Sequence, residues 1–321
     1  MTPTRTAGPV AVLGTARAMA CTVAVHGRVS GDGAPVDPAV ARALDVFRVV
    51  DETCTRFDPS SPLRTINARP GEWHTVPPVL FDAVRAAHTA YERTGGVFDP
   101  RVLTDLVRLG YDRSLPFADG VATPPAEDVP LRRRGPWRPR FRAGPDPGLH
   151  LGGDPVDLGG IGKGLAVRWA SDVLRESCED FLVDAGGDCR CDGTGPEDDG
   201  WLVGVEDPSG GDRPLAVLAL RDRACATSST RLRRWRAGDR PVHHLIDPAT
   251  GQPGDGGLVA VTVVAADAAD AEVAAKTLFL SGADAVADAA RDQRLAALWV
   301  TGKGTFATSA AMDAYVVWRA T

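Results

Sequence analysis

A glycine-rich segment at residues 157–164 (DLGGIGKG) restricts the fold more than any other feature of the chain. The strand-like stretch DPVDL leads into it, and an apolar-periodic stretch from about Leu165 to Arg175 predicts a helix directly after it. Glycines at such a junction let the backbone approach a ligand closely and point its N–H groups at an anion. The segment predicts either a phosphate-binding turn at a helix N-terminus, with Lys163 neutralising the phosphate, or a tight turn without a ligand.

This segment differs from two common phosphate-binding loops. No glycine lies five residues before Gly162, and neither Ser nor Thr follows Lys163, so the pattern is not a Walker loop. It also lacks the GxGxxG spacing of dinucleotide-binding turns. The spacing alone therefore leaves the ligand open.

Strand and helix patterns are mixed along the rest of the chain. We expect strands at residues 21–27, 181–188, 201–208, 214–220, 259–266 and 295–301, the last being the final core strand. We expect further helices from Pro38, with Asp37 as N-cap, and at residues 78–94 and 268–281. Residues 55–73 are interpreted as a polar loop, and the Pro/Arg/Gly-rich residues 112–150 as a connecting segment. The mixture predicts an α+β fold, with mixed sheets flanked by helices, in a single domain spanning residues 1–321.

A histidine pair marks the first candidate catalytic segment, residues 243–251 (HHLIDPATG). A histidine beside Asp247 can act as a general base or orient a reactive hydroxyl. Adjacent residues on a strand point to opposite faces, so we expect only one of the two histidines in a site. The alternative is a polar strand end before an Asp-Pro turn.

Three other segments carry side chains suited to ligands. Glu272 and Lys276 share one face of the predicted Ala-rich helix, either as a half-buried pair near a ligand or as an exposed ion pair. Residues 94–100 (TGGVFDP) offer Phe98 and Asp99 to an aromatic ring. Residues 226–229 (ATSS) offer hydroxyls to a phosphate or a ribose. Both of these last segments are equally consistent with loop caps.

The composition excludes several classes of partner. The net charge is −6 and no basic stripe is present, so we expect no nucleic acid. No apolar run reaches 18 residues, so we expect no membrane insertion. The six cysteines lack the spacing of a zinc site or a disulfide framework, which predicts free thiols and a cytoplasmic location.

Lysine is scarce in this chain. Only Lys163, Lys276 and Lys303 occur among the 36 basic residues. A lysine retained against an arginine background is a candidate for a position that needs a compact point charge, although chance retention is the alternative.

The order of the motifs resembles that of the FAD:protein FMN transferase (ApbE) family. The resemblance runs from Met19 to about Gly282 and rests on RFDPSSPLRTIN, TGGVFDP, DLGGIGKG, LVDAGGD, CATSS, HHLIDPATG and AEVAAKTLFLSG. It implies an α+β fold of T-fold type, FAD as substrate and one magnesium ion. It also implies transfer of FMN from FAD to a Thr or Ser hydroxyl of an acceptor flavoprotein, with release of AMP.

The resemblance assigns roles to individual residues. His244 would be the base and, from adjacency alone, Asp247 would orient it. The metal would take the carbonyl of Gly160 and the carboxylate of Glu272. The cofactor would be held by Met19, Phe57, Val97, Phe98, Asp99, Asp157, Lys163, Thr227 and Ile246.

Three positions depart from the family pattern. Met19-Ala20-Cys21 stands where the family has Met-Gly-Thr, and Thr227-Ser228-Ser229 stands where it has Thr-Ser-Gly. At the third, Lys276 occupies the place of a metal-binding Thr, four residues after Glu272. A charged ammonium group cannot ligate a metal. Either magnesium binds more weakly through Glu272, Gly160 and FAD oxygens, or Lys276 places its own charge where the metal's charge would be.

Two other functions remain open at this point. The chain could bind or store FAD without transferring FMN. It could also be a magnesium-dependent FAD pyrophosphatase, in which water takes the place of the acceptor hydroxyl.

Overall fold

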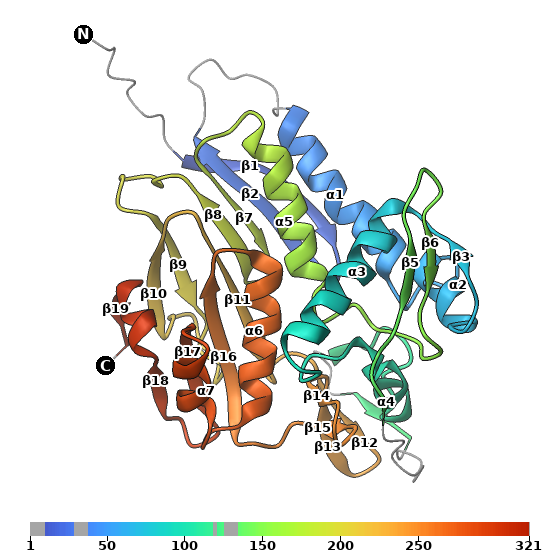
Figure 1. Cartoon of the computed structure of the whole chain (residues 1–321). Helices are drawn as coiled ribbons and strands as arrows, with labels where there is room; N and C mark the ends of the chain where they lie inside the picture. Colours follow the sequence, from blue (N-terminus) through green and yellow to red (C-terminus); the bar gives the residue numbers. More distant parts are fainter. Residues whose placement is uncertain (1–9, 29–37, 118–120, 125–133, 321) are drawn as a thin grey trace.

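An antiparallel sheet of eight strands lies at the centre of the computed structural model, which describes residues 10–28, 38–117, 121–124 and 134–320 (Figure 1). Every neighbouring pair in this sheet is antiparallel. The strands in spatial order are β1 (Val10–Ala18), β2 (Cys21–Arg28), β7 (Phe181–Ala185), β8 (Asp188–Asp192), β11 (Arg223–Ser229), β16 (Leu258–Ala265), β17 (Ala296–Thr301) and β18 (Phe306–Thr308).

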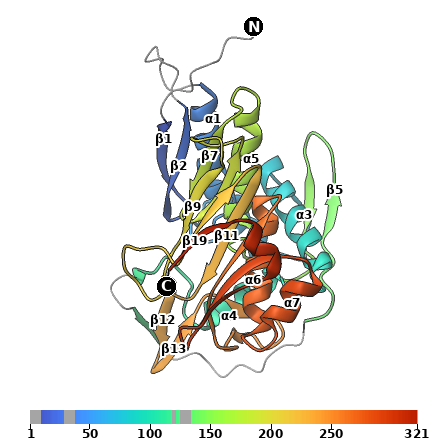
Figure 2. The same cartoon turned by 90° about the vertical axis from the view of Figure 1, so that its left-hand side faces the viewer.

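Three long helices cover one face of this sheet, as Figure 2 shows from the side. They are α1 (Pro38–Cys54), α5 (Gly162–Arg175) and α6 (Ala268–Ser281). Each places apolar residues at helical spacing toward the strands. In α1, for example, Val40, Phe47 and Val50 are buried against β2 and β7, as the sequence pattern predicts. Helix α5 packs between the other two, so its first turn lies deep in the molecule.

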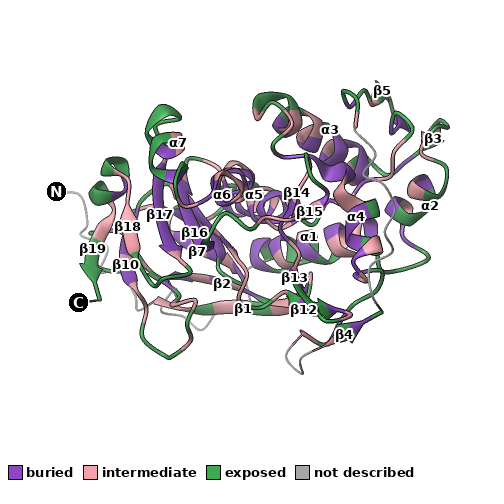
Figure 3. Cartoon of the chain, turned by 90° about the horizontal axis from the view of Figure 1, so that it is seen from below, coloured by how far each residue is buried: buried purple, intermediate pink, exposed green. Residues whose placement is uncertain are grey.

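The opposite face of the sheet is covered by a smaller antiparallel sheet. Its strands are β9 (Trp201–Val205), β10 (Ala216–Leu220) and β19 (Val316–Arg319). The core between the two sheets is apolar and contains Cys189, Cys225, Leu218 and Leu298. Figure 3 shows the buried strands between an exposed outer edge and the helices. Helix α7 (Val286–Asp292) packs against α6 on the helical face, and the 3₁₀ helix η3 (Ala310–Ala314) contacts β17.

A second region of short elements is built around α3 (Pro78–Arg93). Its own core contains Leu80, Leu149 and Phe98, and reaches Leu165 of α5. Its other helices are α2 (Pro62–Ala68), η1 (Pro100–Val102) and α4 (Leu103–Arg108). The short strands are β3 (His74–Thr75), β4 (Ala122–Thr123), β5 (Arg140–Arg142), β6 (Gly148–His150), β12 (Arg234–Ala237), β13 (Arg240–His243), β14 (Ile246–Asp247) and β15 (Gln252–Pro253).

The α+β class and the expected long helices are confirmed, with bounds within a few residues. Two local expectations are wrong. Residues 55–73 contain α2, which Ser61 caps by accepting from the Arg64 N–H. DPVDL (154–158) is extended without strand pairing. Residues 295–301 form the last buried strand of the large sheet, and the half-buried β18 follows at its edge. The described part of residues 112–150 carries the short strands β4, β5 and β6. The expected N-cap, Asp37, lies outside the described residues.

Candidate functional site

The glycine-rich segment opens helix α5, as the sequence predicts, but α5 begins at Gly162 rather than near Leu165. The N-cap residue, Ile161, gives the first turn no side-chain hydrogen bond. Instead the N–H of Gly164 donates to Oε2 of Glu272 on α6, at 2.8 Å. A side chain at position 164 would lie 2.6 Å from the carbonyl oxygen of Ala268, so glycine permits this close approach of the two helices.

Lys163 lies beside this helix start and is held by an acidic residue of the sheet. Its ammonium forms an ion pair with Asp188, at the start of β8, and lies 3.9 Å from Oε1 of Glu272. The Lys163 side chain is 18% exposed, whereas that of Asp188 is only 2% exposed. Burial lowers the pKa of Lys163, Glu272 opposes that shift, and Arg233 adds to it.

Lys276 reaches the glycine turn from α6. Its Nζ occupies the space where a side chain of Gly160 would begin, and the ring of Phe98 lies 3.2 Å from the same point. Among the described residues its ammonium forms no hydrogen bond and no ion pair within 4.0 Å. Burial lowers the pKa of Lys276, while the carboxylates of Glu272 and Asp157 oppose that shift. Lys276 is therefore a cation with unfilled donors, directed at the turn.

Arg56 and Asp157 form a buried ion pair on the other side of the turn. Nε of Arg56 lies 2.6 Å from Oδ2 of Asp157, and Nη1 donates to the carbonyl of Tyr111 at 2.6 Å. Nη2 of Arg56 is buried and has no hydrogen-bond partner among the described residues. The guanidinium lies over the rings of Tyr111 and Phe57, and Phe57 is 37% exposed. A buried nitrogen without a partner is costly unless a ligand supplies the acceptor.

The β1–β2 hairpin brings Met19 to the start of α5. Met19 and Ala20 form its two-residue turn, and both have positive φ, 52° and 60°. Such angles suit glycine and strain other residues. The N–H of Met19 donates to Oδ2 of Asp51 at 2.7 Å, and its Cε lies 3.4 Å from the side-chain position of Gly162.

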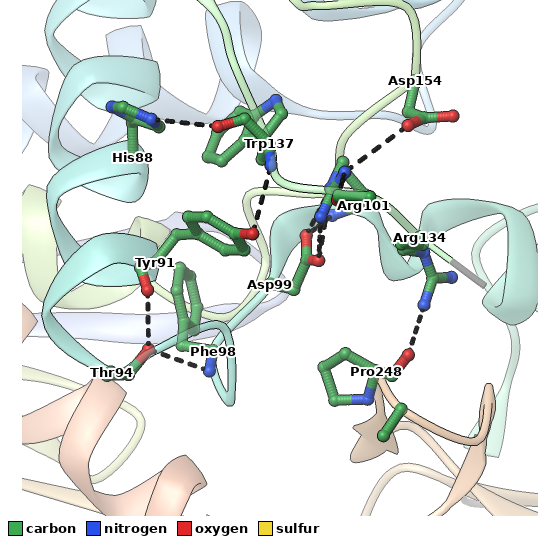
Figure 4. Close-up of polar contacts among 12 residues, drawn as sticks. His88, Tyr91, Thr94, Phe98, Asp99, Arg101, Arg134, Trp137, Asp154 and Pro248 are labelled. Atoms are coloured by element: carbon green, nitrogen blue, oxygen red, sulfur yellow. Dashed lines mark hydrogen bonds and ion pairs between the residues drawn. The ribbon is translucent and has the colours of Figure 1, made fainter.

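The three residues at 97–99 that were predicted to hold the cofactor lie in different surroundings, and Figure 4 shows two of them, Phe98 and Asp99. Phe98 is buried beside the glycine turn, whereas Val97 is 44% exposed. The carboxylate of Asp99 is occupied by its own chain, since it caps η1 and pairs with Arg101 at 2.7 Å. Arg101 in turn lies 3.6 Å from Asp154.

His244 follows β13 and lies among cations. Its Nδ1 is 3.3 Å from the carbonyl oxygen of Arg233, which can only accept, so the hydrogen-bond network assigns the proton to Nδ1 and leaves Nε2 as an acceptor. Burial, with the charges of Arg233 and Lys276, holds the pKa of His244 well below its ordinary value of 6.5. His243 turns away, donating from Nε2 to the carbonyl of Gly254 at 3.0 Å.

Three residues predicted for the site lie in other surroundings. Asp247 receives hydrogen bonds from the Ala249 N–H (2.9 Å) and the Thr250 hydroxyl (3.0 Å), and none of its contacts within the described residues reaches His244. The N–H of Thr227 donates to Oδ1 of Asp188 at 3.2 Å, so its backbone contacts the site. Its side chain has the strand parity of Cys225 and lies on the sheet face opposite α5, where its hydroxyl is 2.9 Å from that of Thr262. Ile246 is buried in an apolar cluster.

Three charged residues of the site were not singled out from the sequence. They are Arg56, Asp188 and Arg233. Each lies in or beside a quoted motif: Arg56 opens RFDPSSPLRTIN, Asp188 ends LVDAGGD and Arg233 follows CATSS. The Arg233 guanidinium, like the Lys276 ammonium, forms no hydrogen bond or ion pair with a described residue.

Two negative findings apply to the described residues. None of their helices is long and apolar enough to cross a membrane. They contain no group of three or more His, Cys, Asp or Glu side chains arranged to hold a metal ion.

The sequence of the chain is similar to those of several named proteins. A protein named FAD:protein FMN transferase from Treponema pallidum (strain Nichols) is 28% identical over 281 residues, which cover 82% of this chain and 76% of that protein. Proteins of the same name from Klebsiella pneumoniae (strain 342) and Escherichia coli (strain K12) are 31% and 28% identical. The chain covers 43% of the length of each of these two relatives.

Solved structures extend the comparison to the fold. The ApbE protein of Thermotoga maritima MSB8 is 26% identical, with a TM-score of 0.78, over 94% of this chain and 97% of that one. The flavinyl transferase ApbE of Pseudomonas stutzeri, in its apo form, is 20% identical with a TM-score of 0.74 over 97% and 98% of the two chains, which supports the fold alone. The model of the ApbE family matches residues 18–299. This chain therefore belongs to the ApbE family.

Proposed function

We propose that this protein transfers FMN from FAD to a hydroxyl group of an acceptor protein and releases AMP. The observation that carries the proposal is the set of cations around the start of α5. Lys276 and Arg233 have no partner among the described residues, and neither has the buried Nη2 of Arg56. A diphosphate would accept hydrogen bonds from these donors. The name of the relatives, FAD:protein FMN transferase, indicates that this diphosphate belongs to FAD.

The residues at the turn fit a flavin dinucleotide. The N-terminal turn of α5 favours an anion, and Lys163 stands beside it. Phe57 presents a partly exposed ring on which an isoalloxazine can stack, and Met19 contacts the turn from the hairpin. The roles of Met19, Phe57, Asp157 and Lys163 in holding FAD are proposals from this arrangement.

Transfer requires a base, and His244 is suited to that role. Its neutral form prevails at neutral pH because its pKa is lowered, and Nε2 is free to accept the proton of the attacking hydroxyl. We propose Thr or Ser as the acceptor residue, as the family resemblance implies, and the un-ionised hydroxyl of either needs such a base. Phosphoryl transfer depends mainly on positioning and charge neutralisation, which the surrounding cations supply.

Magnesium does not fit the residues present. The Lys276 ammonium lies against Gly160, whose carbonyl is one expected ligand. Glu272, the other expected ligand, receives the Gly164 N–H on Oε2 and has Lys163 near Oε1. A divalent cation here would face the like charge of Lys276, so no step of the proposed reaction uses one.

We also propose a reducing, cytoplasmic setting for the reaction. The supporting observation is that all six cysteines are free, including the buried Cys189, Cys191 and Cys225.

The proposal is tested by incubating the protein with FAD and candidate acceptor flavoproteins. Flavin fluorescence that stays on the acceptor after denaturing electrophoresis, with one AMP released per flavin attached, is the expected result. FMN and AMP without labelled acceptor would mean that the protein is a hydrolase. Bound but unchanged FAD would mean that it only binds the dinucleotide.

A further inference from the structure

The position of Lys276 at the glycine turn carries an inference that rests on the proposed function. Its ammonium fills the side-chain space of Gly160, next to the ring of Phe98. Glu272 and Asp157 are the carboxylates whose charges act most strongly on it, yet neither lies within ion-pair distance. A cation held near carboxylates, but bonded to none, has its donors available to an incoming anion.

The choice of lysine at this place also follows from the space available. An ammonium is a compact point charge, whereas a guanidinium is planar and broad. The Lys276 ammonium lies where a Cβ of Gly160 would be, beside the Phe98 ring, and this close approach suits the more compact of the two groups. Only three of the 36 basic residues in this chain are lysines, and two of them, Lys163 and Lys276, meet at this turn.

We propose that Lys276 replaces the divalent cation in this protein, so that FMN transfer proceeds without a bound metal. The oxygen of the acceptor hydroxyl bonds to the FMN-side phosphorus, and the bond from that phosphorus to the bridging oxygen breaks. AMP leaves with the bridging oxygen, and the hydroxyl proton passes to Nε2 of His244. Negative charge grows on the departing AMP phosphate, and the Lys276 ammonium offsets it.

Gly160 has a definite part in this arrangement. A methyl group at that position would overlap the Lys276 ammonium, so the missing side chain is what allows the cation to sit there. Gly160 is not one of the positive-φ glycines, so its backbone does not otherwise require glycine. Gly160→Ala should therefore act through Lys276.

The first experiment measures AMP release and acceptor labelling in excess chelator and in millimolar Mg²⁺. The wild-type rate should differ by no more than about twofold between the two buffers. Lys276→Thr should lose about 10²-fold in chelator and recover most of that loss in Mg²⁺, because a hydroxyl can ligate the ion. Lys303→Thr, the same change at an exposed lysine, is the matched control and should behave as wild type. A wild-type protein that is inactive in chelator and restored by Mg²⁺ would overturn the proposal.

A binding measurement separates this inference from the proposed function. If neither buffer supports transfer, the proposed function fails, and FAD affinity followed by flavin fluorescence still decides the role of Lys276. Wild type should bind FAD equally well in both buffers, and Lys276→Met should bind it about tenfold more weakly in both. Binding that requires Mg²⁺, or affinity unchanged in Lys276→Met, would refute the inference.

The last measurement tests the contact itself. Gly160→Ala and Lys276→Met should each weaken FAD binding, and the double variant should be no weaker than Lys276→Met alone. Additive losses would show that the two residues act separately and would contradict the seating of Lys276 against Gly160.

Discussion

The two faces of strand β8 are both buried, but they hold opposite kinds of side chain. Cys189 and Cys191 point into the apolar core beneath the small sheet. Asp188, Arg190 and Asp192 alternate with them and point toward the helices, where Lys163 and Arg175 of α5 meet the two carboxylates. One face supplies packing, and the other supplies paired charges at a site. Burial by itself therefore does not separate structural from functional residues in this fold.

The largest effect is expected from breaking the charged face at Lys163. Lys163→Met removes a cation from the diphosphate site and should lower kcat/KM about 10³-fold. It also leaves Asp188 buried without its partner, which should cost about 3–5 kcal/mol of unfolding free energy in urea. Lys163→Met with Asp188→Asn should recover most of the stability and none of the activity. Full stability in the single variant would mean that the pair is not buried as described.

The next test concerns His244, which lies among the cations on the same side of the sheet. Its neutral form accepts the proton, and its pKa is lowered, so kcat/KM should show no acid-side decrease until the pH falls below 6.5. Below the lowered pKa it should fall about tenfold per pH unit. The acid limb should be absent from the residual activity of His244→Gln. An acid limb of the kcat/KM profile centred at or above pH 6.5 would contradict the buried, cation-rich surroundings described for His244.

On the apolar face a smaller and different effect is expected. Cys189→Ala removes a sulfur that is buried with Cys191 and Cys225 in the core beneath the small sheet, and should cost about 1 kcal/mol of stability. Its activity should stay within about twofold of wild type, because this side chain faces away from α5. Chemical denaturation measures the expected loss of stability, and the labelling assay measures the activity. A loss of activity well beyond twofold in the folded variant would mean that the two faces of β8 do not differ in function as described.

The smallest effect is expected at the hairpin that carries Met19. Ala20 has a φ of 60°, so Ala20→Gly should stabilise the protein by about 0.5–1 kcal/mol. Ala24→Gly, in the extended part of β2, should destabilise it by a similar amount. Thermal unfolding of both variants tests whether the backbone strain is confined to the turn beside the site. If both substitutions stabilised the protein, or both destabilised it, the strain would not be confined to the turn.

The long helices could be predicted from the sequence because periodicity is a local property. Helix α6 was expected at its observed bounds, and α1 and α3 nearly so. Helix α2 was missed although Ser61 and Pro62 form a usual helix start, because polar residues surround it. Strand β8 was missed because its alternate charged residues suggest an exposed segment, whereas the fold buries all five.

The site itself could be predicted only where its residues lie within motifs. Local spacing indicated the turn at residues 157–164, the pair His243–His244 and the Glu272–Lys276 face, and the family resemblance selected His244 from that pair. The pairs Lys163–Asp188 and Arg56–Asp157 join segments far apart in the chain, so no local pattern indicates them. The close approach of Lys276 to Gly160 likewise depends on how α6 packs against the glycine turn. A sequence alone does not show such a contact.

The site draws its residues from most of the length of the chain, from Met19 between β1 and β2 to Lys276 in α6. No contiguous fragment of the chain contains enough of these residues to bind a dinucleotide. An unfolded or half-folded chain would then have negligible affinity, and FAD would act as a selective stabiliser of the completed protein. At a hundred times its dissociation constant it would add about 2.7 kcal/mol to the free energy of unfolding. Cellular FAD would in this way favour the survival of correctly folded copies.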